Sequence, residues 1–312
     1  MKLRFSPLQL TLATLVFVLL IIGSCSKERS SNEDAAQEEQ ASLASSESDG
    51  EAELVFNEVF DDAMGASDEV GMAGTGIFGR AANTQPGDVA RPDTLPPCVT
   101  VTVTHLNPPN IFPEKIVIDF GNTGCLCRDG HTRKGKIITE YTARLLYPNA
   151  VATTTFDGFY IDSIKVEGTH KITNTGTTST NPPNRQFTVD VINAKLTKPN
   201  GNYTYWNSHK VITQTEGLLT PGIPTDDVFK VEGSAHGQVK RDNLIVAWES
   251  NILDPLIKKF SCRWIVKGTV KTVRVATNVS PRWIAVLDFG TGNCDNQAVI
   301  TINGVPHQIT LH

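Results

Sequence analysis

Hydrophobic and polar residues alternate with a period of two over much of the chain from residue 98 onward. In the first such stretch Val99, Val101 and Val103 alternate with three threonines. Successive side chains of a β-strand point to opposite faces, so this spacing places the valines on one face and the threonines on the other. The pattern predicts a strand with one buried face and one face in water.

Ten further stretches are predicted strands, and turn residues such as those at 199–202, 241–243 and 303–304 separate them. Asn303 and Gly304 suit a tight hairpin because both tolerate positive φ. No helical segment long enough for a parallel crossover intervenes. The predicted fold class is all-β, an antiparallel sandwich or extended meander. The ten predicted strands are residues 115–120, 135–146, 159–172, 186–197, 203–214, 228–239, 244–249, 259–275, 283–289 and 298–311.

One short helix is predicted before the strands, at residues 51–66. Its apolar residues return at helical spacing on one face, and its acidic residues occupy the other. A helix of four turns is marginal in water, so we expect its apolar face to dock on the β domain or on a partner. The alternative is a weakly populated helix within a linker. The apolar face consists of Ala52, Val55, Phe56, Val59, Phe60 and Ala63.

Residues 1–24 have the layout of a secretory signal, with Lys2 and Arg4 before an apolar run that ends in small residues. The run is shorter than the roughly 20 residues that cross a bilayer. Ile22-Gly23-Ser24-Cys25 resembles the lipobox of bacterial lipoproteins. This resemblance implies cleavage before Cys25 and acylation of its thiol; the alternative is an ordinary signal in which Cys25 has no role.

Charge is distributed unevenly along the chain. Residues 26–69 contain fourteen acidic and two basic residues, and we expect residues 25–50 to be a lipidated cysteine followed by a disordered acidic tether. Glycine and proline are frequent in residues 67–97, which we predict to be a second linker. Because the whole chain has a net charge of −5, the part from residue 70 onward carries a surplus of five positive charges. That surplus is too dilute to indicate nucleic-acid binding.

Two short sequences recur in the predicted β domain, residues 98–312. Residues 119–125 (DFGNTGC) resemble residues 288–294 (DFGTGNC), and each follows an apolar strand. A second element, around Gly168, Gly233 and Gly268, occurs three times. These repeats indicate an internally duplicated β-unit, with halves of about 98–217 and 218–312. We interpret Asp119 and Asp288 as turn caps rather than calcium ligands.

The cysteines other than Cys25 are disulfide candidates in an oxidising compartment. The parallel placement of the two repeats favours a bond between Cys98 and Cys125 and another between Cys262 and Cys294, which leaves Cys127 over. The sequence Cys125-Leu126-Cys127 is too short for a zinc motif, so no metal site is predicted.

Candidate ligand contacts are a basic turn and a group of aromatic residues. The basic turn could meet an anionic partner, and the aromatic residues could stack on a sugar. A solvated hairpin and strand packing are the alternatives. The candidates for anion or glycan contact are Arg128, Arg133, Lys134, Lys136, Tyr203, Tyr205 and Trp206.

No catalytic motif, paired carboxylates or cofactor signature is found in the sequence. The lipobox, the acidic tether and the threonine-rich strands together resemble the envelope lipoproteins of the Bacteroidota. The resemblance implies a chain held in the outer membrane through acylated Cys25, facing the periplasm or the cell surface. We expect a non-catalytic binding or structural β domain with a glycan or protein ligand. A hydrolase of envelope or dietary polysaccharide, and a closed sheet that carries a lipid, are the alternatives.

Overall fold

The computed structural model describes residues 7–66, 96–127, 130–181, 183–220, 224–275 and 283–311, with side chains from residue 34 onward. The chain divides into two compact units, residues 1–41 and 42–312. The second unit contains every strand. The predicted linker at 67–97 lies outside the described residues except for its last two. Within the described part, no helix combines the length and apolar character that crossing a membrane requires.

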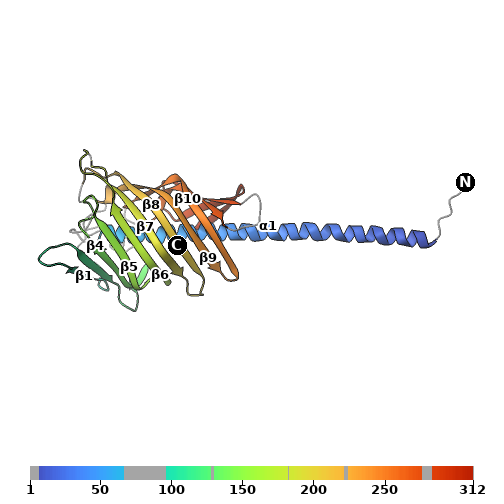
Figure 1. Cartoon of the computed structure of the whole chain (residues 1–312), viewed down its shortest axis with the longest axis horizontal. Coiled ribbons are helices and arrows are strands. Elements are labelled where there is room, and N and C mark those ends of the chain that lie inside the picture. The colour runs from blue at the N-terminus through green and yellow to red at the C-terminus, as the bar shows by residue number, and fades with distance from the viewer. Residues whose placement is uncertain are drawn as a thin grey trace. The chain divides into compact units, whose positions relative to one another are not determined.

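The described strands form one antiparallel sheet in which neighbours in the chain are neighbours in space, from β1 to β14, with β3 attached beside β4 (Figure 1). The all-β antiparallel prediction is confirmed, in its meander form. The strands are β1 (Thr100–His105), β2 (Glu114–Asp119), β3 (Cys125–Leu126), β4 (Thr132–Tyr141), β5 (Val151–Ile161), β6 (Ile164–Asn174), β7 (Gln186–Thr197), β8 (Tyr203–Glu216), β9 (Val228–Arg241), β10 (Leu244–Lys259), β11 (Ile265–Arg274), β12 (Ile284–Thr291), β13 (Gln297–Ile302) and β14 (Val305–Thr310).

Tight turns connect several of these strands. Asn303 and Gly304 both have positive φ, as the hairpin prediction required. A second turn of this kind, Asp162-Ser163, divides the predicted strand 159–172 into β5 and β6. This division was missed because the turn contains no glycine or proline. The first part of β5, which begins at Val151, was also not predicted.

The helix α1 (Pro7–Met64) is much longer than the predicted helix. Residues 26–50 were expected to be disordered, and this expectation is wrong: all of them lie in α1. Those from Ser42 onward belong to the unit that contains the sheet, where Ala44, Ser46 and Asp49 are buried. Small serine and alanine side chains allow the helix to pack closely against the sheet, so low apolar content did not mean exposure.

The predicted docking of the helix on the β domain is observed, and the sheet curls around the helix (Figure 1). Phe56 stacks on Trp206 with ring centroids 5.6 Å apart, and Phe60 makes edge contacts with Phe187 and Phe229. The acidic face was expected to be in water, but it is buried as well: Glu53 and Asp61 are at most 4 % exposed. Residues 52–64 of the helix are therefore buried on every face.

Basic residues on the inner face and rim of the sheet neutralise the acidic helix. Lys210 pairs with Glu53 at 2.8 Å, and Lys258 pairs with Asp61 at 2.7 Å. A buried carboxylate is tolerated when such a partner is present. Two further ion pairs lie at the rim of the sheet and are partly exposed. Arg241 pairs with Glu47 at 2.6 Å, and Lys198 pairs with Glu51 at 2.9 Å.

Asp49 is bound differently, by two tryptophan side chains. The indole nitrogens of Trp206 and Trp248 donate to one of its oxygens, at 2.8 and 3.1 Å. Burial raises the pKa of Asp49, although Lys210 and the two indoles oppose the rise. The two largest aromatic residues of the inner face thus hold the helix by hydrogen bonds as well as by contact area.

The thrice-repeated glycine has a steric reason. Gly168, Gly233 and Gly268 all have positive φ, at 122°, 137° and 117°. A side chain at Gly168 would lie 2.7 Å from the Cα of Ala194 on the neighbouring strand. The pairing register shifts beside Gly168 and Gly268. Because bulges of this kind bend a strand and increase its twist, the repeat helps the sheet to curl.

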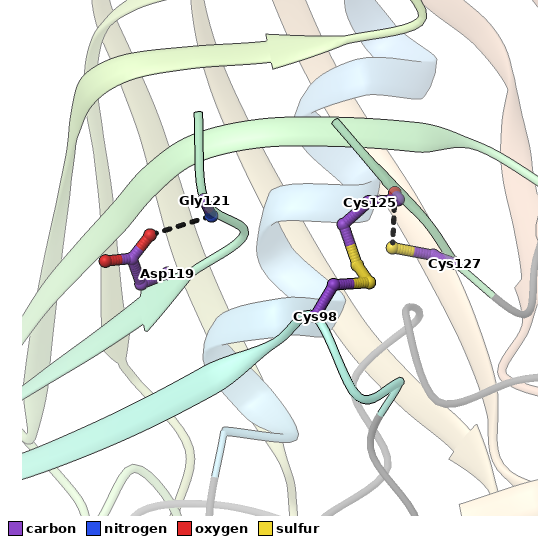
Figure 2. Close-up of a disulfide and its surroundings, with 5 residues drawn as sticks. All are labelled: Cys98, Asp119, Gly121, Cys125 and Cys127. Atoms are coloured by element: carbon purple, nitrogen blue, oxygen red, sulfur yellow. Dashed lines mark hydrogen bonds between the residues drawn. A yellow bond between two sulfur atoms is a disulfide. The ribbon is translucent and has the colours of Figure 1, made fainter. Parts of the chain in front are cut away.

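Both predicted disulfides are present, between Cys98 and Cys125 and between Cys262 and Cys294. Figure 2 shows the first, with the Cys127 thiol donating to the carbonyl oxygen of Cys125 at 3.5 Å. Cys127 takes part in neither disulfide.

The two Asp-Phe-Gly sequences have the same local structure. The backbone nitrogen of Gly121 donates to the Asp119 carboxylate, and that of Gly290 donates to Asp288, both at 2.8 Å. The interpretation of these aspartates as turn caps is confirmed. The two proposed halves do not separate, however, since β8 and β9 pair along most of their length across residue 217.

Replacing Lys210 with methionine should strongly destabilise the fold. The change leaves the carboxylate of Glu53 buried without its cation, which costs about 3–5 kcal/mol of unfolding free energy. The measurement is denaturant unfolding of the full chain. Lys171→Met, which changes an exposed lysine of β6, is the control and should change the stability little. Equal stability of both variants would contradict the burial of the pair.

A groove and a band of lysine and tyrosine on the outer face

A groove of about 820 Å³ lies at the ends of strands β4 to β8. Its size falls within the range of small-molecule sites. The groove is lined by the loop before β3, the start of β4, the β5–β6 hairpin and the β7–β8 turn. The lining residues are Thr123, Gly124, Thr132, Lys134, Tyr160, Asp162, Ser163, Lys165, Thr197, Lys198 and Pro199.

Three lysines give the groove a positive character. The Nζ atom of Lys134 lies 4.0 Å from the ring centroid of Tyr160, a cation–π arrangement that fixes both side chains. Lys165 pairs with Glu167 at 2.7 Å, and Lys198 pairs with Glu51 of α1. The latter two lysines are held by neighbours outside the groove lining, so they can be shared with an incoming anion.

The carboxylate of Asp162 would repel an anion, but it is already occupied. One oxygen accepts a hydrogen bond from the backbone nitrogen of Thr132 at 2.8 Å, and the other contacts the imidazole of His131. Hydroxyl groups add neutral polar contacts. The oxygen of Thr197 is shielded from water and has no hydrogen-bond partner in the described part of the chain.

Four groove residues belong to a straight row that crosses the outer face of the sheet. Each residue of the row is the direct cross-strand partner of the next, from β4 to β10. We call this row the lysine–tyrosine band. It consists of Lys134, Tyr160, Lys165, Thr197, Tyr203, Lys240 and Ile245.

A second row runs beside the band, two residues further along the strands. Lys195 of β7 faces Tyr205 of β8, which faces Gln238 of β9. The rings of Tyr203 and Tyr205 meet edge to face at 5.0 Å, and the Lys195 ammonium lies over both, at 5.1 and 5.4 Å. Tyr205 is 41 % exposed. The two rows thus join basic and aromatic side chains on one solvent-facing surface.

The structure brings some of the predicted contact residues to this surface and separates others. Lys134 and Tyr203 lie in the band, and Tyr205 lies beside it. Lys136 is nearby on β4 but pairs with Asp119 at 3.2 Å. Arg128 lies outside the described residues.

Two predicted contact residues, Arg133 and Trp206, face the interior and need correction. Each is 1 % exposed; Arg133 pairs with Glu58 of α1, and Trp206 binds Asp49. Side chains alternate along a strand, so Arg133 and Lys134 point to opposite faces, as do Tyr205 and Trp206. The prediction had grouped residues that are adjacent in sequence, and adjacent residues lie on opposite faces of the sheet.

Five lysine, tyrosine and threonine residues of the two rows were not among the predicted contacts. The sequence signal for them was the pairing across each turn, which places Tyr160 opposite Lys165 and Thr197 opposite Tyr203. The turn at 199–202 was predicted, so the pairing of Thr197 with Tyr203 was within reach of the sequence, whereas the Asp162-Ser163 turn was missed and with it the pairing of Tyr160 with Lys165. The five residues are Tyr160, Lys165, Lys195, Thr197 and Lys240.

A buried cluster of ionisable groups lies close to the groove, around Glu58 of α1. Arg133 donates to Glu58 at 3.0 Å, and His131 lies 3.3 Å from it. Burial alone would raise the pKa of Glu58, but the hydrogen bond from His131 and the charge of Arg133 lower it to about 2. Arg263, from the β10–β11 connection, contacts Nε2 of the imidazole, the nitrogen that also faces Glu58. The cluster therefore links β4 to a distant part of the sheet.

The imidazole of His131 favours its protonated form. Burial alone would lower the pKa of His131, but the hydrogen bond and charge of Glu58 raise it, with a further contribution from Asp162. Glu58, His131 and Arg133 are buried beneath the outer face, and Asp162 connects them to the groove. Within the described residues, no group of three or more potential ligands could hold a metal ion. The cluster fastens the helix to the sheet.

Comparison with known proteins finds no family, no curated protein and no solved structure that matches the chain. The function proposed below therefore follows from the groove, from the lysine–tyrosine band and from the N-terminal sequence.

Acid should weaken the fold through Glu58. Its folded-state pKa is depressed, so its stabilisation is complete above the unfolded value of 4.5 and is lost as the pH falls towards 2, an effect of about 3 kcal/mol. Denaturant unfolding at a series of pH values measures this loss. Glu58→Gln should be less stable at neutral pH and show a shallower acid dependence. The control Glu140→Gln, at an exposed position, should behave like the unchanged protein; parallel acid profiles for Glu58→Gln and wild type would refute the assignment.

Proposed function

We propose that this chain is an envelope lipoprotein, held in the outer membrane by acylated Cys25, whose β domain binds an acidic sugar without catalysis. The observation that carries the binding role is the groove, in which three lysines, one tyrosine face and several hydroxyls converge. Lysine supplies charge for a carboxylate or phosphate, and tyrosine supplies a flat surface for a sugar ring.

The groove favours binding over hydrolysis. Glycoside hydrolases generally use two carboxyl groups on opposite sides of the scissile bond. Asp162 is the one acidic residue in the groove lining, and both of its oxygens are engaged by Thr132 and His131. Among the described residues, the three groove lysines are not paired with a serine, threonine or cysteine that they could activate as a nucleophile. The arrangement can hold an anion but does not present an acid and a base to it.

The anchor accounts for the N-terminal sequence. Acylation of a cysteine with several chains gives stable membrane attachment, since each buried methylene contributes about 0.8 kcal/mol. The compact unit that contains the sheet begins at Ser42, seventeen residues after Cys25 in the sequence. The segment between them is the link from the bilayer to the binding domain.

Cells that express the full chain should incorporate radiolabelled palmitate through Cys25. Cys25→Ala should abolish the label because the acyl acceptor is gone. Cys127→Ala is the matched control, since this buried cysteine lies outside both disulfides; it should remain labelled. Equal labelling of Cys25→Ala and wild type would contradict the anchor.

Trigalacturonate, a short acidic sugar, should bind the full-length protein in mild detergent, and maltotriose, a neutral sugar of similar size, should bind far less. Lys134→Ala and Tyr160→Ala should each weaken binding about tenfold, which corresponds to about 1.4 kcal/mol. Calorimetric titration at low salt measures this, and added salt should reduce the affinity.

The matched controls for this titration are exposed residues outside the two rows. Lys171→Ala and Tyr147→Ala remove one lysine and one tyrosine of this kind and should leave the affinity unchanged. Equal binding of the acidic and neutral sugars, or equal losses in all four variants, would contradict recognition by the groove.

A further inference from the structure

We infer that the natural ligand is a linear acidic polysaccharide that starts in the groove and crosses the strands along the lysine–tyrosine band as far as Lys240. The inference rests on the proposed function, because it extends the same site. The groove alone would suit one or two sugar units. The band continues its chemistry over two further strands, β8 and β9, and this continuation is the basis for a polymer.

The band is straight because of the pairing register. Lys134 faces Tyr160, Tyr160 faces Lys165, and Lys165 faces Thr197. The row then continues through Tyr203 to Lys240. All of these side chains are on the outer face, since their neighbours in sequence are buried against the helix. A ligand could therefore contact each in turn without bending around the sheet edge.

The length of the band exceeds what a small ligand can reach. Adjacent strands lie about 4.8 Å apart, so Lys165 is about 10 Å from Lys134, and Lys240 about 24 Å, measured along the sheet. Lys195 of the second row fills the interval between Lys165 and Lys240. In the two rows taken together, a lysine therefore occurs every one to two strands. A polymer with regularly spaced negative charges matches this distribution, whereas a single sugar acid meets one end of it.

Aromatic faces alternate with the cations along the same line. Tyr160 lies in the groove, and Tyr203 and Tyr205 lie beyond it, with their edge-to-face contact holding both rings. The two rows together hold four lysines and one carboxylate, Glu167, which is already paired with Lys165. Alternating charges and rings bind anionic chains in a sequence-tolerant way, by the reasoning that applies to extended single strands.

A protein partner fits these observations less well. Lysine is under-represented in the centre of protein–protein interfaces. The positions of the band that a protein partner would cover are rich in lysine, so a protein partner is disfavoured.

The test is a length series of oligogalacturonates, from the dimer to the octamer, titrated into the full-length protein in mild detergent. Affinity should rise with length until the oligomer spans the band and should then level off, because no further contacts are added. Lys240→Ala combined with Tyr205→Ala should leave the dimer unaffected and weaken the octamer about tenfold. Lys134→Ala should weaken every length, and Lys171→Ala should weaken none.

The outcomes separate this inference from the proposed function. If the dimer and the octamer bind equally well and Lys134→Ala weakens both, the inference of a polymeric ligand is wrong, and the proposed binding of an acidic sugar in the groove is supported. Absence of binding at every length would overturn both. Length-dependent binding that Lys240→Ala and Tyr205→Ala do not affect would place the polymer elsewhere on the molecule and overturn the band. Preference for vesicles of phosphatidylglycerol over oligogalacturonate would overturn the polysaccharide in favour of a lipid surface.

Discussion

The β domain depends on charge pairing between an acidic helix and the sheet that surrounds it. Residues 42–64 contain seven acidic and no basic residues, and within the described structure lysines and arginines of the sheet pair with five of these acids. Each cation comes from a different strand or turn, so the helix connects parts of the sheet that do not pair directly. Without it, the inner face would expose large aromatic side chains such as Trp206 and Trp248 to water, which costs free energy. The sheet and the helix therefore stabilise each other.

This dependence also determines which residues are left for the outside. Basic residues of the inner face, such as Arg133 and Lys210, serve the helix, and the alternate positions on the same strands carry the outer cations. The outer surface thus obtains its positive character from a chain whose total charge is negative, because residues 26–69 account for the negative excess. Charge separation of this kind makes a basic outer surface compatible with a low isoelectric point. The two locations of lysine, inside against the helix and outside in water, follow from the two faces of one strand.

Much of the fold was predictable, and the failures have identifiable causes. Alternation of apolar and polar residues gave the antiparallel sheet, and the position of the repeats gave both disulfide pairs. The burial of the acidic helix could not be predicted, because hydrophobicity alone assigns Glu53 and Asp61 to water; their partners, Lys210 and Lys258, are about 160 and 200 residues away in sequence. For the candidate site, Lys134, Tyr203 and Tyr205 were identified from local composition. Tyr160 and Lys165 were not, since their juxtaposition requires the turn at Asp162-Ser163 to be known.

The course of α1 into the interior of the sheet has a mechanical consequence. If the chain is pulled from its N-terminal side, tension reaches the domain through the helix, and no strand is loaded first. The force is then divided among the ion pairs and the aromatic contacts along the helix, which must shear together, whereas an edge strand would peel away one hydrogen bond at a time. A domain held in this way is suited to remain folded under a load applied at its N-terminal side.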